Sequence, residues 1–187
     1  LALVADHVLR KTPGPVVTNC STSRMTQDLA EKYDVPFFRS KVGEANVVDL
    51  MLAEKAILGG EGNGGVIDPR VGLVRDSFAG MALMLDAMAA REKTVSALVA
   101  ELPQYAIHKA KVTLPTDKIS AAFVSLQHHF ENASCDNLDG LRFDWPGKWL
   151  LIRGSNTEPI VRIFAEAPTA EEAKKLCDEA EKILTAN

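Results

Sequence analysis

The 187-residue sequence has few cysteines, few aromatic residues and no excess of positive charge. Its three cysteines, Cys20, Cys135 and Cys177, lie far apart, and no pair has the spacing of a zinc site or a redox motif. This excludes a disulfide scaffold, and we expect three small buried residues in a reducing, cytoplasmic compartment. Lys and Arg total 21 and Asp and Glu 25, a net charge of −4, which is a poor basis for general nucleic-acid binding.

Long apolar runs and metal-ligand clusters are also missing. The apolar stretches fall well short of the roughly 20 residues that span a bilayer, so no membrane segment is expected. Asp6 and His7 interrupt the only apolar run near the start, which argues against a signal peptide. The aspartates and histidines show no metal-ligand spacing, and no nucleophile motif is found, so neither a metal site nor a catalytic residue is predicted in this chain. Because the sequence opens at Leu1, inside a helical pattern, we expect a piece of a longer protein.

The first half of the sequence alternates short apolar strands with helices. Strands are predicted at residues 15–20, 35–39 and 56–58, and helices at 1–12, 21–33, 47–55 and 76–91. Strands that alternate with helices at short spacing predict an α/β domain with a mostly parallel, mixed sheet, which we assign to residues 1–92.

The second half has strands that follow one another directly. They are predicted at residues 107–114, 140–145, 149–153 and 159–167, with a helix at 116–131 and another that starts from a capping box of Thr169 and Glu172. Neighbouring strands joined by tight turns are antiparallel. Residues 93–187 are therefore expected to form an α+β domain, with an antiparallel four-stranded sheet and two helices on one face; the boundary lies within residues 92–104.

A glycine-rich loop follows the strand at residues 56–58. Five glycines in the seven residues 59–65 cost more chain entropy than a plain turn requires. The loop leaves a presumed parallel strand at its carboxyl end, where α/β folds place ligands. Glu61 and Asn63, with Gly64 beside them, supply a carboxylate and an amide suited to vicinal hydroxyls. The other interpretation is a flexible connection with incidental polar residues.

A second polar segment joins two predicted strands of the second domain. Arg153 can hold a phosphate through two parallel N–H groups, and successive backbone N–H groups can form an anion-binding nest. A hairpin turn rich in ordinary turn formers would look similar. Lys41, after a predicted strand of the first domain, is a further candidate for an anionic or sugar ligand, although a lone lysine is often a solvated charge. The segment comprises Arg153, Gly154, Ser155, Asn156, Thr157 and Glu158, with Arg162 nearby as a ligand or, preferably, as the support of Glu158.

These segments together resemble those of the α-D-phosphohexomutases, which include phosphomannomutase/phosphoglucomutase and phosphoglucosamine mutase. Residues 60–64 are similar to the family's sugar-binding loop, residues 153–159 to its phosphate-binding loop, and residues 40–43 to its segment with a ligand-binding lysine. The resemblance covers the third and fourth of four domains. It departs from the common pattern at Asn63, where serine is usual, and at Gly65, where many members have histidine.

The resemblance implies an isomerase that moves a phosphoryl group between the 1- and 6-positions of a hexose through a bisphosphorylated sugar. It further implies that Glu61, Asn63 and Gly64 bind the sugar, that Arg153, Gly154, Ser155, Asn156, Thr157 and Lys41 bind phosphate, and that Glu158 and Arg162 support them. The phosphorylated serine and the Mg²⁺ ligands would lie in missing N-terminal domains, so the chain alone would be inactive. The alternative is a non-catalytic sugar-phosphate-binding or regulatory module.

Overall fold

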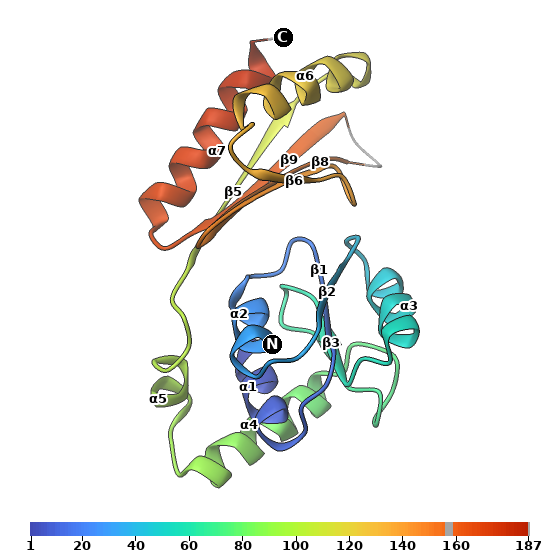
Figure 1. Ribbon diagram of the computed structural model, residues 1–187, viewed down its shortest axis with the longest axis vertical. Helices are drawn as coiled ribbons and strands as arrows, with labels where there is room; N and C mark the ends of the chain where they lie inside the picture. Colours follow the sequence, from blue (N-terminus) through green and yellow to red (C-terminus); the bar gives the residue numbers. More distant parts are fainter. Residues whose placement is uncertain (156–158, 187) are drawn as a thin grey trace. The chain divides into compact units, whose positions relative to one another are not determined.

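The computed structural model describes residues 1–155 and 159–186, without the side chain of Thr116. The chain divides into two compact units, Leu1–Gln104 and Tyr105–Asn187 (Figure 1). Each unit has its own hydrophobic core, and each is described by itself.

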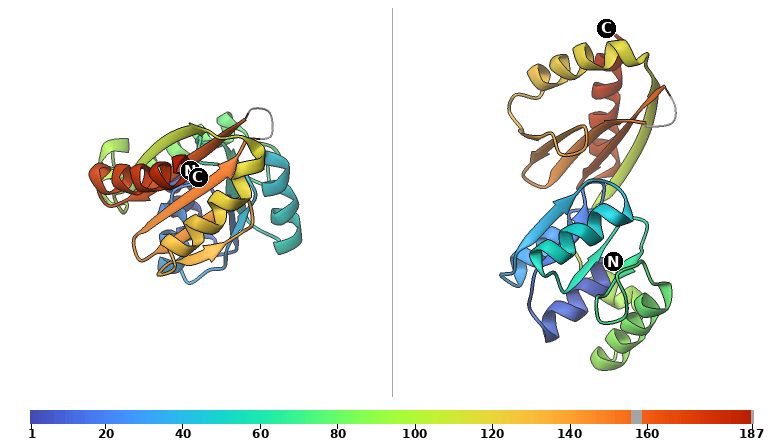
Figure 2. Two further views of the ribbon diagram at one scale, coloured as in Figure 1. Left: turned by 90° about the horizontal axis from the view of Figure 1, so that it is seen from above. Right: turned by 90° about the vertical axis from the view of Figure 1, so that its right-hand side faces the viewer.

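The first unit is a three-layer α/β structure. Its sheet has the order β2-β1-β3-β4, with β1 parallel to β2 and β3, and β4 antiparallel to β3. Helices α1, α2 and α4 cover one face and α3 the other (Figures 1 and 2). The elements are α1 (Ala2–Lys11), β1 (Val16–Asn19), α2 (Met25–Lys32), β2 (Phe37–Ser40), α3 (Glu44–Glu54), β3 (Leu58–Gly60), β4 (Val66–Ile67), α4 (Ser77–Arg91) and α5 (Val95–Val99).

Side-chain alternation along β1 divides the core of the first unit between the two faces of the sheet. Val16 packs with Leu9 of α1, whereas its neighbour Val17 packs with Val47 and Met51 of α3. All five of these residues are almost fully buried. Successive strand residues point to opposite faces, so the adjacent apolar residues Val16 and Val17 allow helices to pack on both sides of β1.

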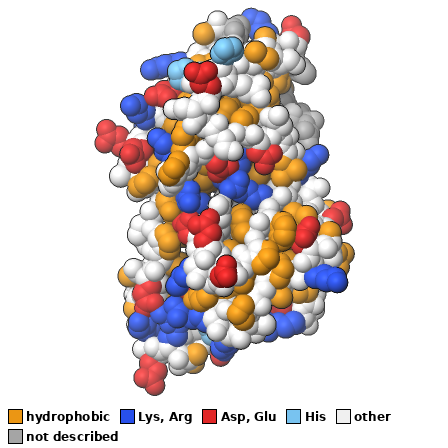
Figure 3. Space-filling model, in the orientation of Figure 1, with side chains coloured by type: hydrophobic (Ala, Val, Ile, Leu, Met, Phe, Trp, Pro, Cys, Tyr) orange, Lys and Arg blue, Asp and Glu red, His pale blue; other side chains and the backbone are white. Residues whose placement is uncertain are grey.

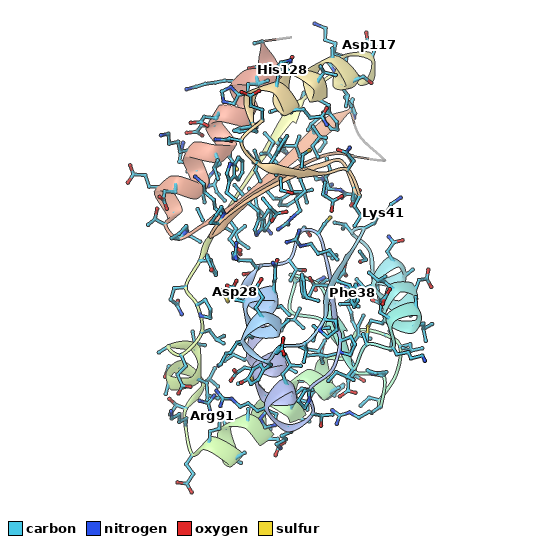
Figure 4. The ribbon with its side chains drawn as sticks, in the orientation of Figure 1. Asp28, Phe38, Lys41, Arg91, Asp117 and His128 are labelled. Atoms are coloured by element: carbon cyan, nitrogen blue, oxygen red, sulfur yellow. The ribbon has the colours of Figure 1, made fainter. Side chains whose placement is uncertain are left out.

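A buried carboxylate joins three helices of the first unit. Asp6 of α1 accepts hydrogen bonds from the Tyr33 hydroxyl (2.7 Å), Lys32 Nζ (3.1 Å), Arg10 Nε (2.9 Å) and Arg91 Nη1 (3.2 Å). Lys and Arg side chains gather where α1, α4 and α5 meet (Figure 3), and Figure 4 labels Arg91 among them. Burial alone would raise the pKa of Asp6, but these donors outweigh it and hold the pKa below its ordinary value. Burial and the hydrogen bond to Asp6 raise the pKa of Tyr33 to about 12.

The second unit is a two-layer α+β structure. Its antiparallel sheet has the order β5-β9-β8-β7-β6, and α6 and α7 both lie on one face (Figures 1 and 2). Thr169 accepts the Glu172 N–H at 3.2 Å, so the expected cap of α7 is confirmed. The elements are β5 (Ala106–Thr113), α6 (Thr116–His129), β6 (Ser134–Asp136), β7 (Leu141–Trp145), β8 (Lys148–Gly154), β9 (Ile160–Ala167) and α7 (Ala170–Thr185).

The predicted fold class is confirmed, with a correction to the number of strands. The second sheet has five strands rather than four, because Ser134–Asp136 pairs with β7. All three residues of this edge strand are exposed, so it lacks the apolar alternation that marks a half-buried strand. The first sheet likewise has an additional two-residue strand, Val66–Ile67, which is too short to show the alternation of apolar and polar residues by which strands are predicted.

Candidate functional site

The three parallel strands of the first unit end at one edge of the sheet. Because Asn19, Ser40 and Gly60 are the last residues of β1, β2 and β3, the loops that follow begin side by side in the order of the strands. Lys41 and Glu61 are the first residues of two of these loops. The carboxyl edge of a parallel sheet is where such folds bind ligands.

Glu61 presents a buried and fully oriented carboxylate at this edge. Its side chain is only 9% exposed. Oε1 accepts hydrogen bonds from Asn19 Nδ2 at 2.8 Å and from the Gly43 N–H at 3.1 Å, and Oε2 lies 3.2 Å from Arg75 Nη1. A buried carboxylate requires such donors to offset its lost hydration. The carboxylate is therefore held as an acceptor in one orientation.

Asn19 is a member of the site that the sequence analysis missed. Its Oδ1 accepts from the Ser21 N–H and the Ser21 hydroxyl, both at 3.0 Å, and from the Thr22 hydroxyl at 2.8 Å. With Oδ1 used in this way, the amide nitrogen turns to Glu61. Its position in the sequence could have identified it, because Asn19 is a polar residue at the carboxyl end of a predicted strand. That strand lies next to the one that leads to the glycine-rich loop.

Arg75 and Glu44 were also missed, because they lie far from the loop in sequence. Arg75 comes just before α4, and Glu44 is the first residue of α3. The Arg75 guanidinium pairs with the Glu44 carboxylate and holds the pKa of that carboxyl below its ordinary value. A shallow pocket of about 490 Å³ adjoins them. It is lined by Glu44, Asn63, Gly64, Gly65, Arg75 and Ser77.

The glycine-rich loop is a tight turn rather than a loose connection. The Gly64 N–H donates to the Glu61 carbonyl at 3.1 Å, and the Gly65 N–H donates to Asn63 Oδ1 at 3.1 Å. Gly64 has φ of +91°, a conformation that side-chain-bearing residues rarely adopt. The turn brings Asn63 to the pocket lining, while Glu61 lies beneath it.

Lys41 lies at the same edge but is not part of the hydrogen-bonded group around Glu61. Its side chain is exposed. Figure 4 shows it beyond the end of β2, at the margin of the first unit. Its proposed role toward phosphate stays a prediction.

The phosphate segment predicted in the second unit starts at the end of β8. Arg153 is largely buried, with 16% of its side chain exposed, and its Nε lies 3.2 Å from Asp139 Oδ2. The Ser155 N–H donates to the Ile160 carbonyl at 2.9 Å, which closes the connection between β8 and β9. Asn156, Thr157 and Glu158, which were predicted as ligands or support, lie outside the described residues.

Three cationic residues stand in a row across this end of the second sheet. Arg162 of β9 is paired directly with Arg153 of β8 on one side and with Lys111 of β5 on the other. Their strand neighbours Val161, Ile152 and Val112 belong to the core beneath the helices, so the three cations are on the opposite face. Like charges directly opposite each other repel. This row, next to Gly154 and Ser155, favours an anion.

The described residues contain no group of three or more His, Cys, Asp or Glu side chains placed to hold a metal ion. The acidic residues near the site, Glu44 and Glu61, are instead occupied by Arg75. These residues therefore do not fit a Mg²⁺ site. Within residues 1–155 and 159–186, every helix falls short of the length and apolar content that a membrane crossing requires.

The chain combines an α/β unit with a polar carboxyl edge and an α+β unit with a row of cations across its sheet, and each unit matches one domain of a single family of enzymes. Residues 1–105 match the family model described as phosphoglucomutase/phosphomannomutase, alpha/beta/alpha domain III. Residues 109–183 match the phosphoglucomutase/phosphomannomutase C-terminal domain. The chain belongs to the phosphoglucomutase/phosphomannomutase family, as the resemblance predicted.

Relatives of known name extend over nearly all of this chain. A phosphoglucomutase/phosphomannomutase of Thermococcus kodakarensis is 37% identical over 185 residues, which are 98% of this chain and 41% of that protein. A probable phosphoglucosamine mutase of Thermococcus gammatolerans is 33% identical over 98% of this chain and 42% of its own length. The chain thus spans about two fifths of the length of these relatives.

Solved structures show the same fold. A phosphoglucomutase/phosphomannomutase family protein from Burkholderia thailandensis has a TM-score of 0.79 and 25% identity, covering 100% of this chain and 40% of that one. The fold is also that of a putative phosphomannomutase from Thermus thermophilus, with a TM-score of 0.75 and 23% identity over 98% of this chain and 40% of that one.

Proposed function

We propose that this chain is the substrate-binding C-terminal part of a phosphohexomutase that interconverts hexose 1-phosphate and hexose 6-phosphate through a bisphosphorylated sugar. The observation that carries the proposal is the Glu61 carboxylate, buried and oriented by Asn19, Gly43 and Arg75 at the carboxyl edge of a parallel sheet. Family membership supports the reaction class.

Glu61, Asn63 and Gly64 are proposed to bind the sugar hydroxyls. A carboxylate accepts hydrogen bonds from hydroxyls, and an amide both donates and accepts, so the pair suits two neighbouring hydroxyl groups. The orientation of Glu61 is set before a ligand arrives, and a preorganised group loses less free energy on binding. These residues position the substrate and transfer no phosphoryl group themselves.

Arg153, Gly154 and Ser155, with Asn156, Thr157 and Lys41, are proposed to bind the phosphate that does not react. The row of Arg153, Arg162 and Lys111 supports this assignment, because its three positive charges exceed the one carboxylate, Asp139, that lies against Arg153, and an anion would reduce the remaining repulsion. Arg162 and Glu158 are proposed to support the segment. Guanidinium groups hold phosphate more strongly than neutral donors do.

The test of the sugar site is a titration of this chain with glucose 1-phosphate, mannose 1-phosphate and inorganic phosphate, followed by amide NMR shifts. We expect both sugar phosphates to shift Gly62, Asn63, Gly65 and Ser155, and inorganic phosphate to shift Ser155 but leave the glycine-rich loop unchanged. Glu61→Gln should remove the shifts in the loop. The matched control is Glu101→Gln, a carboxylate of the same unit that pairs with Arg91 and Lys93 away from the loop. Shifts that avoid both segments would refute the proposal.

The serine nucleophile and the Mg²⁺ ligands are proposed to lie in the N-terminal domains of the full-length protein. Mg²⁺ and a sugar bisphosphate would then be required for turnover, and this chain alone would be inactive. The expected result is mutase activity of the full-length protein that is lost with EDTA and restored by Mg²⁺. A non-catalytic binding module, the alternative, would bind the same ligands but show no activity at full length.

The partner of the first unit is proposed to be these same N-terminal domains. Phe78, Met81 and Leu85, three residues of α4 at helical spacing, are 81%, 53% and 65% exposed. Met81 and Leu85 line a groove of about 540 Å³, together with Leu1 and Leu3 of the amino-terminal segment. An apolar face of this kind marks an interaction surface. Since the relatives are more than twice as long, the face is available for the rest of the polypeptide.

A further inference from the structure

We propose that Arg75 is a positioning residue of the sugar site, which acts by holding the Glu61 carboxylate toward the substrate. The proposal rests on the sugar-binding function proposed above for the glycine-rich loop. It adds a residue outside that loop and outside every segment that the sequence motifs single out. Arg75 lies ten residues beyond Gly65, in the connection that precedes α4.

The Arg75 guanidinium bridges two carboxylates that come from different elements. Nη1 lies 3.2 Å from Glu61 Oε2, Nε pairs with Glu44 Oε2, and the Arg75 backbone N–H lies 3.4 Å from Glu44 Oε1. Glu44 thus holds Arg75 at two points, and Arg75 holds Glu61. A planar guanidinium can span two acceptors in this way, whereas the compact ammonium of lysine acts as a point charge.

The two oxygens of Glu61 have different tasks in this arrangement. Oε1 already accepts two hydrogen bonds, from Asn19 and Gly43. Oε2 accepts from Arg75 and keeps acceptor capacity, because a carboxylate oxygen can accept more than one hydrogen bond. The sugar hydroxyl would therefore be received at the oxygen whose direction Arg75 sets.

Gly65 creates the space in which Arg75 lies. A Cβ atom at position 65 would be 2.5 Å from Arg75 Cδ, 2.9 Å from Cγ and 3.2 Å from Cβ. Atoms at such distances overlap, so any side chain at position 65 must push the arginine stem away. The absence of a side chain at Gly65 therefore leaves the space through which the Arg75 side chain reaches Glu61.

The experiment is a set of variants of the full-length protein, assayed for kcat and KM with glucose 1-phosphate and mannose 1-phosphate. Arg75→Gln should raise KM about tenfold, the loss expected for one charge-assisted hydrogen bond, with kcat changed by less. Arg75→Lys should give a smaller rise. Gly65→Ala should reproduce the rise of Arg75→Gln, and should add nothing to it in the double variant.

The decisive comparison uses Glu61→Gln as the background. If Arg75 acts through Glu61, Arg75→Gln should change KM by less than about twofold there. The matched control is Arg70→Gln, since Arg70 pairs with buried Asp68 in the same unit but does not line the pocket. It should leave KM unchanged, while its thermal unfolding reports the cost of losing an arginine pair.

Each outcome bears on a different claim. An unchanged KM in Arg75→Gln, or a full additive effect in the Glu61→Gln background, overturns the role of Arg75 and leaves the sugar-binding loop in place. An unchanged KM in Glu61→Gln overturns the loop assignment itself, and the role of Arg75 with it. If Arg75→Gln does not fold, the Arg75→Lys and Gly65→Ala variants carry the same comparison.

Discussion

At the scale of single residues, the three cysteines differ more than their sequence suggests. Cys20 and Cys177 are buried as expected, but Cys135 is exposed on the edge strand β6, which corrects the expectation that all three are buried. Burial, aided by the neighbouring Asp178 charge, raises the pKa of the Cys177 thiol to about 12. The thiolate is the reactive form, so this thiol is nearly inert at neutral pH.

We therefore predict that a maleimide at pH 7 labels Cys135 rapidly and Cys177 only when the protein unfolds. Cys177 is both buried and protonated, whereas Cys135 lies at the surface. Mass spectrometry of the labelled peptides measures the two rates separately, and addition of denaturant provides the control for full labelling. Equal rates in the native protein would contradict the packing of α7 described above.

Asp6 is a residue whose importance no sequence motif reveals. A buried carboxylate that loses its charge leaves several cationic partners uncompensated, so Asp6→Asn should lower the free energy of unfolding of the first unit by about 3–5 kcal/mol. Urea denaturation followed by circular dichroism measures the change. Asp86→Asn, at a carboxylate that is 53% exposed, is the control, and a much smaller loss is expected there.

The lowered pKa of Asp6 also gives a direction for the effect of acid. Because the folded-state pKa lies below the unfolded value, the group stabilises the fold fully above the unfolded pKa, about 4. That contribution is lost as the pH falls through the folded pKa. Unfolding free energies measured from pH 6 to pH 2 should decline less steeply in Asp6→Asn than in the wild type. Parallel curves would show that Asp6 titrates normally.

At the scale of elements, the long periodic segments were predictable and the short polar ones were not. The helix expected at 76–91 is observed at Ser77–Arg91, with Asp76 accepting the Ala79 N–H at 2.9 Å as its cap. Strands β4 and β6 were missed, because two or three residues contain no period to detect. Hydrophobic periodicity in the sequence therefore predicted the helices and the longer strands. The short strands β4 and β6 are defined only by their pairing in the folded structure.

The same limit applied to the candidate site. Glu61 and Asn63 were found because they share a loop with an unusual number of glycines. Asn19, Glu44 and Arg75 were missed, because they come from three other places in the chain and meet Glu61 only through the order of the strands. A sequence motif consists of residues that are close together along the chain, whereas the residues that orient the Glu61 carboxylate are close to it only in the folded structure.

The cationic row of the second sheet leads to a prediction for strand β9. Arg162→Gln removes the central charge between Arg153 and Lys111, so it should slightly stabilise the ligand-free protein, by about 0.2–1 kcal/mol. It should also weaken the stabilisation that inorganic phosphate provides. Thermal unfolding with and without phosphate measures both effects. Lys109→Gln, on the neighbouring strand β5 opposite Phe164 of β9, is the control that should change neither. A phosphate effect equal to that of the wild type would remove Arg162 from the anion site.

At the scale of the whole molecule, the apolar face of α4 predicts how the isolated chain behaves. With Phe78, Met81 and Leu85 exposed, the 187-residue chain should self-associate at high concentration. Phe78→Ser combined with Leu85→Ser should restore the monomer, as sedimentation velocity would show. The same double substitution should destabilise the full-length protein, where we propose that other domains cover this face.

The separate hydrophobic cores of the two units affect how substitutions can accumulate during evolution. The glycine-rich loop extends from a strand that packs among α1, α3 and α4, and Arg153 lies on a strand that packs beneath α6 and α7. A substitution that loosens the core of one unit leaves the packing of the other core intact. If the two segments bind sugar and phosphate as we propose, sugar preference and phosphate affinity can change through independent substitutions.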